Sequence, residues 1–99
     1  MDYELASSRL KALGHPTRLR ICYLLRDYHS CVKELELALG LKQPNISQHL
    51  RILKDLGLVQ VARKGQTCCY SINKELLGPL LEHWSRLHPA DDTPVSQPA

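Results

Sequence analysis

The sequence predicts a mostly α-helical domain with one small β-hairpin, and three observations support this fold class. Apolar residues recur at helical spacing over residues 2–56, a strand pattern follows over residues 58–72, and helical spacing returns from Pro79. A chain of 99 residues has room for one domain and one modest core. Helices, then a hairpin, then a helix is the element order of a winged helix-turn-helix.

Four helices are expected before the hairpin. Gly14 ends the first helix, and Pro16 opens the second at its first position, where the missing N–H costs nothing. The second helix carries an apolar stripe of Leu19, Cys22 and Leu25. The four expected ranges are residues 2–13, 16–27, 31–39 and 44–56.

A hairpin is expected after Gly57, which ends the fourth helix. Residues 58–64 and 67–72 are predicted to form two strands joined at Gly65-Gln66. This small β-hairpin would be the wing of the fold.

The last helix is expected to run from Pro79 to about Leu87, after a turn or kink at Gly78-Pro79, because proline interrupts a helix that arrives from upstream. The following tail has three prolines and no apolar period, which is typical of disorder. We therefore expect a domain over residues 1–88 and a disordered tail over residues 89–99.

Composition favours a protein of the cytoplasm. Charged residues make up 23% and apolar residues 43% of the chain, and no apolar run approaches the ~18 residues of a membrane span. Residues 1–4 lack the basic and apolar regions of a signal peptide. The four cysteines are therefore expected as thiols or ligands rather than as disulfides.

Positive charge is concentrated in the middle of the chain. Residues 41–74 carry six lysines and arginines against Asp55 alone, while residues 75–99 carry one arginine against four acidic residues. A basic segment between neutral and acidic flanks is typical of a surface that binds a polyanion such as DNA.

The third and fourth helices, with a tight glycine turn between them, are predicted to form a helix-turn-helix whose fourth helix enters the major groove. At helical spacing Ile46, Leu50 and Leu53 fall in one sector and must face the core. His49 projects toward the core side and is expected to be packed and hydrogen-bonded. The residues expected to contact DNA lie on the opposite face of the helix, around its start and at the hairpin tip: Lys42, Gln43, Pro44, Asn45, Ser47, Gln48, Arg51, Arg63, Lys64 and Gln66.

The chemistry of these side chains suits double-stranded operator DNA. Gln48 can pair bidentately with adenine, Arg51 can bind guanine or phosphate, and Ser47 suits either kind of partner. Backbone N–H groups at the start of the helix can meet phosphate, as can Lys64 at the hairpin tip.

Four segments of the chain resemble the ArsR/SmtB family of repressors. They are residues 10–21, 43–53, 57–59 and 65–72, and the likeness extends over about residues 5–88. The resemblance implies a winged helix that dimerises through its first and last helices, and operator binding that ends when an effector binds. It also implies that Gln43, Pro44, Ser47 and Gln48 read the operator, with Gly65-Gln66 as the wing tip.

A homodimer is also expected from the last helix itself. Its apolar stripe is wide, and a domain of this size cannot bury that stripe together with every other helix face. The predicted dimer interface consists of Leu77, Leu80, Leu81, Trp84 and Leu87.

Neither metal site of the resembled family is complete. The arsenic-sensing branch has Cys-Val-Cys-Asp-Leu on the third helix, where this chain keeps Cys31 but has Lys33 in place of the second cysteine. The zinc-sensing branch uses an Asp-x-His pair and a later histidine on the last helix, whereas Glu82, His83 and His88 have the wrong spacing.

The remaining thiols leave the inducer open. Neighbours on a strand point to opposite faces, so Cys68 is expected to be buried and Cys69 more exposed. Cys31 is expected in the first turn of a helix, two residues after His29, where a thiolate is favoured. A sensor would use Cys31 with Cys68 or Cys69, and would respond to As(III), Sb(III) or another thiophilic metal ion, or to an oxidising sulfur species. Cys22 is expected to be a small core residue.

Two other functional classes were weighed. An enzyme could use Cys31 as nucleophile and His29 as base, but no oxyanion loop, third orienting residue or cofactor motif accompanies them. A winged-helix protein-interaction module without effector sensing is the second alternative, although the polar face of the fourth helix is intact. The sequence therefore predicts a sequence-specific repressor that is not an enzyme.

Overall fold

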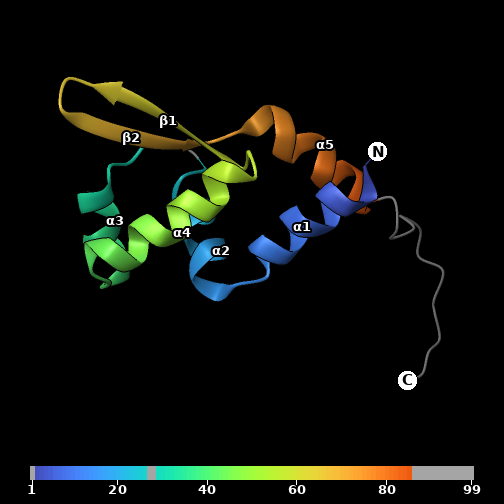
Figure 1. The fold of residues 1–99 in the computed structure, drawn as a ribbon, viewed down its shortest axis with the longest axis horizontal. Coiled ribbons are helices and arrows are strands. Elements are labelled where there is room, and N and C mark those ends of the chain that lie inside the picture. Colours follow the sequence, from blue (N-terminus) through green and yellow to red (C-terminus); the bar gives the residue numbers. More distant parts are fainter. Residues whose placement is uncertain (1, 27–28, 86–99) are drawn as a thin grey trace.

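The computed structural model describes residues 2–26 and 29–85, with the side chains of this part up to Glu82. Five helices and one antiparallel pair of strands follow one another in the described part (Figure 1). They are α1 (Tyr3–Leu13), α2 (Pro16–Leu24), α3 (Val32–Leu39), α4 (Gln43–Asp55), β1 (Val59–Lys64), β2 (Thr67–Ile72) and α5 (Lys74–Ser85). The predicted winged helix-turn-helix architecture is confirmed.

Side chains at the helix starts explain where several elements begin. The Asp2 carboxylate accepts the backbone N–H of Leu5 at 3.1 Å and starts α1. His15 does the same for α2, because its Nδ1 accepts the N–H of Thr17 at 3.1 Å. The second helix ends at Leu24, earlier than the sequence predicts.

One apolar core joins the helices to the base of the hairpin. Ile46, Leu50 and Leu53 of α4 are each at most 1% exposed, as their spacing predicts. They belong to a cluster with Ile21 from α2 and Leu35 from α3. Burying side chains of this size stabilises the fold by roughly 1.5–3 kcal/mol each. The orientation of α4 is therefore set by its apolar face.

The hairpin has the predicted strands and turn. Val59 pairs with Ile72 at its base and Lys64 with Thr67 at its tip, where Gly65 adopts a φ of 65°. The second edge of β2 is also paired, because Ser30 and Tyr70 exchange two backbone hydrogen bonds of 3.0 and 2.8 Å. The segment that leads into α3 therefore lies against the wing.

The start of α5 corrects the prediction from sequence. The helix begins at Lys74 and continues through Pro79, so the predicted start at Pro79 after a turn at Gly78 is wrong. The Asn73 side chain donates to the Gly57 carbonyl at 2.9 Å and fixes the first turn. Leu80 is buried in the core and Leu76 and Leu77 pack against it, and this burial outweighs the one hydrogen bond that proline removes.

Different helices and strands lie at the two ends of the molecule. Figure 1 shows α1 and α5 side by side at one end, with the hairpin tip, α3 and the first residues of α4 at the other. Leu87 and the predicted tail of residues 89–99 lie outside the described residues.

The continuous α5 leads to a stability prediction. Pro79→Ala restores the backbone donor for the exposed Glu75 carbonyl, and we expect it to raise the free energy of unfolding by about 1–3 kcal/mol. Gly78→Ala is the matched substitution, since a methyl group there meets no atom within 4 Å, and should add about 0.5–1 kcal/mol. Urea denaturation measures both, and a loss of stability in both variants would contradict a helix through residues 74–79.

Candidate nucleic-acid interface

The exposed face of α4 carries polar side chains that a DNA groove can accept. Gly40 ends α3 with a φ of 68°, and the short turn to Lys42 sets α4 against α3 as a helix-turn-helix. The predicted contact residues of this helix and its start are exposed, with Ser47 half-buried: Lys42, Gln43, Pro44, Asn45, Ser47, Gln48 and Arg51. The structure therefore places the helix residues of the predicted set together on one face and around one helix end.

Two of these side chains are already held in place. The Gln43 Nε2 donates a hydrogen bond of 2.8 Å to the Ser47 Oγ, one turn further along the helix. This bond limits the rotamers that both side chains sample, so less freedom is lost when they meet a base edge.

Arg51 makes only a weak ion pair within the protein and can exchange it for a contact with DNA. Its Nε lies 3.9 Å from the Asp55 Oδ2, and the two side chains are 84% and 69% exposed. A surface pair of this kind is worth about 0–1 kcal/mol. A phosphate or a guanine edge can therefore replace Asp55 at little cost.

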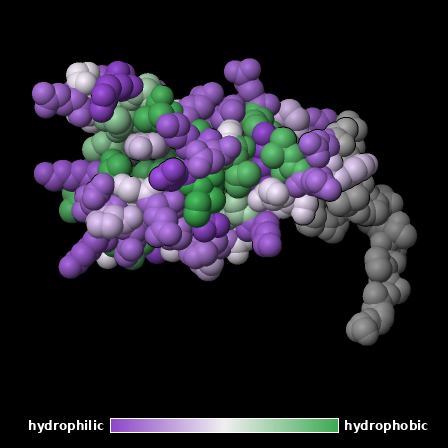
Figure 2. All heavy atoms as spheres, in the orientation of Figure 1, coloured by the Kyte–Doolittle hydropathy of each residue, from purple (hydrophilic) through white to green (hydrophobic). Residues whose placement is uncertain are grey.

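The hairpin tip adds cations at the same end of the molecule. Arg63, Lys64 and Gln66 are all exposed, as predicted. Figure 2 shows hydrophilic side chains projecting from the end that carries the hairpin tip, and the start of α4 lies at this end too. The polar side chains at the start of α4 and the cations of the hairpin tip are thus presented at the same end of the molecule.

A half-buried cluster behind α4 was only partly foreseen. The His49 Nδ1 accepts a hydrogen bond of 3.2 Å from the Arg18 Nε, and the His49 ring lies 4.7 Å from the ring of His15, centroid to centroid. His49 is packed and hydrogen-bonded, as predicted. The role of Arg18 was missed, although it follows His15 by one helical turn and so faces the same neighbour.

The surroundings of His49 favour the neutral form of its ring. Partial burial lowers its pKa from the ordinary value, and the positive charges of His15 and Arg18 lower it further. A neutral ring can accept the Arg18 hydrogen bond, whereas a protonated one cannot. The hydrogen bond from Arg18 to His49 therefore links α2 to α4 most firmly at pH values above the ordinary pKa of histidine.

Comparison with known proteins decides the family. The family described as "Bacterial regulatory protein, arsR family" matches residues 15–61. The HTH-type transcriptional regulator NmtR of Mycobacterium tuberculosis is 37% identical over 86 residues, which cover 83% of this chain and 72% of that protein. This chain belongs to the arsR family.

Other relatives agree with this assignment. The HTH-type transcriptional repressor SmtB of M. tuberculosis is 42% identical over 69 residues, and the matched part spans 70% of this chain and about half (51%) of that repressor. Among solved structures, HlyU from Vibrio cholerae superposes with a TM-score of 0.74 at 33% identity, covering 89% of this chain and 98% of that one. These relatives are named as regulators and not as enzymes, in line with the prediction.

The predicted dimer interface of this arsR-family chain stays a prediction, and its residues differ in exposure within one chain. Leu80 is only 6% exposed and belongs to the monomer core. Leu77 is half-buried, Leu81 is 53% exposed, and the Trp84 side chain and Leu87 lie outside the described part. A partner can therefore reach only some of the predicted stripe.

An apolar groove that the sequence analysis missed lies beside Leu81. Its volume is about 570 Å³, and it runs between α2 and α5. Leu19 and Tyr23 of α2 line it and are 56% and 64% exposed, although Leu19 was expected in one apolar stripe with Cys22. The buried residues of α2 are Ile21 and Cys22, and Leu19 is left at the surface.

The cysteines fall into two environments. Cys22 is 8% exposed, and burial raises the pKa of its thiol to about 11, so it is the core residue that was expected. Cys31 precedes α3 as its N-terminal flanking residue rather than lying in its first turn. Cys68 and Cys69 are both half-buried, so Cys68 is less enclosed than expected. Cys68 lies opposite exposed Arg63 near the tip, beyond the reach of the core.

The described residues contain no group of three or more His, Cys, Asp or Glu side chains placed to hold a metal ion. Within that part of the chain, no helix is long and apolar enough to cross a membrane.

The lowered pKa of His49 predicts how stability varies with pH. As the pH falls from about 7 toward 5, the unfolded chain takes up this proton first, so the folded state loses stability. We expect the urea midpoint of the wild type to fall over this range and that of His49→Gln to fall less. His29→Gln changes an exposed histidine outside the cluster and serves as control. Equal losses in wild type and His49→Gln would contradict the role of His49.

Proposed function

We propose that this arsR-family chain is a transcriptional repressor that binds operator DNA as a homodimer and is released by an effector. The observation that carries the proposal is the division of α4 into a buried apolar face and an exposed face of Gln43, Ser47, Gln48 and Arg51. The name of the relative SmtB, a transcriptional repressor, supports the direction of regulation.

Sequence recognition is assigned to the middle of α4. Gln48 is exposed at the centre of the face, where its amide can donate to and accept from an adenine edge in the major groove. Ser47, oriented by Gln43, supplies a second short polar contact. These groups select the operator, because they can meet base edges rather than phosphates alone.

Affinity and position come from phosphate contacts around this centre. Lys42 at the start of α4 suits one stretch of the DNA backbone, and Arg63 and Lys64 on the hairpin suit another. Their contribution depends on salt concentration and not on base sequence.

The dimer is proposed to form through the apolar groove between α2 and α5 and the adjoining surface of α5. Leu81 and the α2–α5 groove expose apolar surface at Leu19 and Tyr23, away from the reading face. Two reading heads related by a two-fold axis match a palindromic operator with half-sites about one DNA turn apart.

The effector is proposed to act on the thiols outside the core. Cys31, Cys68 and Cys69 are half-buried and thus reachable, whereas Cys22 is enclosed. As(III), Sb(III) or another thiophilic metal ion, or an oxidising sulfur species, would each react with such thiols. Induction then needs a coupling of roughly 1–3 kcal/mol between thiols and DNA.

The recognition face can be tested with two substitutions. Gln48→Ala should weaken specific operator binding by about 1–3 kcal/mol and leave non-specific binding nearly unchanged. Lys64→Ala should weaken binding to all sequences alike and reduce the salt slope by about one unit. Gel shifts against the upstream DNA at several salt concentrations measure both. An unchanged specificity ratio in Gln48→Ala would contradict the assignment, and no binding by wild type at any salt would favour a protein-interaction module.

The dimer can be tested at Leu81. Leu81→Glu places an unpaired charge in the proposed interface, and we expect the dimer Kd to rise by about 100-fold or more. Leu37→Glu is the matched control, since Leu37 is 83% exposed on α3, far from the groove. Sedimentation velocity reports both, and a Leu81→Glu dimer as tight as wild type would exclude this end of the molecule as the interface.

A further inference from the structure

The pairing between the segment before α3 and the wing brings two cysteines together. Ser30 donates its N–H to the Tyr70 carbonyl at 3.0 Å and accepts the Tyr70 N–H at 2.8 Å. The pairing is antiparallel. In such a ladder the residue after one partner lies opposite the residue before the other. Cys31 is therefore placed opposite Cys69.

The local backbone suits this placement. Cys31 has φ −88° and ψ 169°, so the chain is still extended there and turns into α3 only at Val32. Because Ser30 and Tyr70 exchange both hydrogen bonds, the next pair is of the non-hydrogen-bonded type, with Cα atoms about 4.5 Å apart in regular sheets. That separation is within the ~4.4–6.8 Å range of disulfides.

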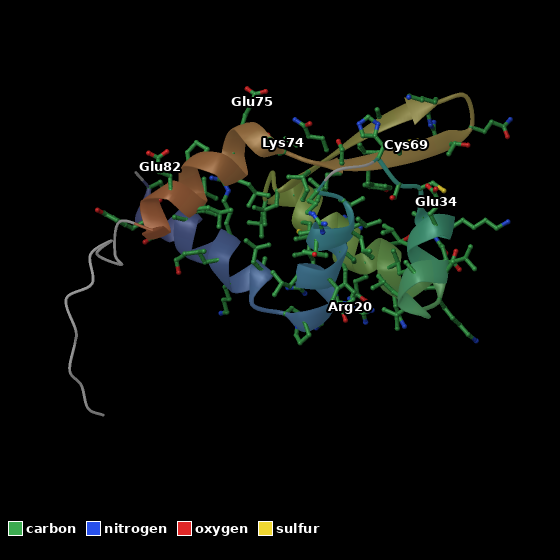
Figure 3. The ribbon with its side chains drawn as sticks, turned by 180° about the vertical axis from the view of Figure 1, so that it is seen from behind. Arg20, Glu34, Cys69, Lys74, Glu75 and Glu82 are labelled. Atoms are coloured by element: carbon green, nitrogen blue, oxygen red, sulfur yellow. The ribbon has the colours of Figure 1, made fainter. Side chains whose placement is uncertain are left out.

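The direction of the side chains distinguishes Cys69 from Cys68 as the partner of Cys31. Successive side chains on a strand point to opposite faces, and facing residues of paired strands point to the same face. Cys31 and Cys69 thus share a face, while Cys68 lies on the other face with Tyr70. Figure 3 shows the labelled Cys69 on β2 close to the start of α3, which carries the labelled Glu34.

We propose that Cys31 and Cys69 are a redox-active pair that a peroxide oxidises to a disulfide, tying the wing to the helix-turn-helix. Both thiols are half-buried, which leaves them accessible to a small oxidant. Among the described residues, no group of three or more His, Cys, Asp or Glu side chains is placed to hold a metal ion, and two thiols are the number that a disulfide needs.

The reaction balances with peroxide as the named oxidant. The Cys31 thiolate attacks one peroxide oxygen, the O–O bond breaks, and Cys31 becomes a sulfenic acid while the other oxygen leaves as water. The Cys69 thiolate then attacks the Cys31 sulfur, the S–O bond breaks, and a second water leaves. Two thiols and one hydrogen peroxide give one disulfide and two waters.

Glu34 holds Cys31 in position at the start of α3. Its Oε1 accepts the Cys31 backbone N–H at 2.8 Å. This bond and a second one from the thiol hold the pKa of the Glu34 carboxyl below its ordinary value. The Glu34 carboxylate therefore fixes both the backbone and the side chain of Cys31 beside β2.

The consequence for DNA rests on the proposed function. The tie would join β2 of the wing to α3, the first helix of the helix-turn-helix, and in that proposal the hairpin and α4 contact different parts of the DNA. Oxidation would restrict how the wing adjusts to the duplex. We expect operator affinity to fall by about 5- to 150-fold, the usual range of an allosteric coupling.

Peptide mapping tests the disulfide without any DNA. The full chain is treated with hydrogen peroxide, the remaining thiols are blocked, and the protein is digested with trypsin without reduction. The expected product links peptide 27–33, which contains Cys31, to peptide 65–74, which contains Cys68 and Cys69. A non-reducing gel should show that the oxidised chain keeps the mass of one chain.

Serine variants identify the partner thiol. Cys31→Ser and Cys69→Ser should lose the linked product, and Cys68→Ser, the matched control in the same strand and peptide, should keep it. A link that survives in Cys69→Ser but disappears in Cys68→Ser overturns the pairing, as do links between two chains or overoxidised thiols alone.

Gel shifts then separate this inference from the proposed function. Peroxide should weaken operator binding by wild type and Cys68→Ser but not by Cys31→Ser or Cys69→Ser. If reduced wild type binds no DNA, the proposed function fails while the mapped disulfide stands. If the disulfide forms and operator affinity is unchanged, the coupling to DNA is overturned.

Discussion

The burial of one face of α4 is the constraint on which the rest of the structure depends. Ile46, Leu50 and Leu53 are almost completely buried. Only one rotation of the helix about its own axis buries all three of them. That rotation alone places Gln48 and Arg51 outward. The core thus determines which side chains reach solvent, and the same packing against α2 and α3 sets the direction in which the helix projects.

The second organising feature is β2, which is paired on both edges. Val61 of β1 faces Tyr70 on one side, and Ser30 faces it on the other. An isolated two-stranded hairpin is marginally stable in water, so the Ser30 bridge supports the wing as well as linking it to α3. Beyond the apolar core at the base of the hairpin, this residue pair therefore links the wing to α3, and Cys31 and Cys69 follow directly beside it.

Local patterns were sufficient for most of the fold and for the exposed face of α4. The apolar spacing of α4 and the Gly65 turn depend on residues close in sequence, and both were predicted correctly. The start of α5, the exposure of Leu19 and the contact between Arg18 and His49 were not predicted. Each of these features depends on which element, distant in sequence, packs against the residue concerned. Local sequence patterns do not show that packing.

The corrected packing of α5 also changes how the two ends of the molecule are related. With Leu80 in the core, α5 supports the same cluster that orients α4, so the proposed dimer interface and the proposed DNA-reading face share one body of buried side chains. A close-packed core transmits strain poorly by bending and well by shifting as a unit. In the proposed dimer, a change at the α2–α5 groove would therefore alter the angle between the two DNA-reading faces, whereas a change at Cys31 and Cys69 would alter the wing within one subunit.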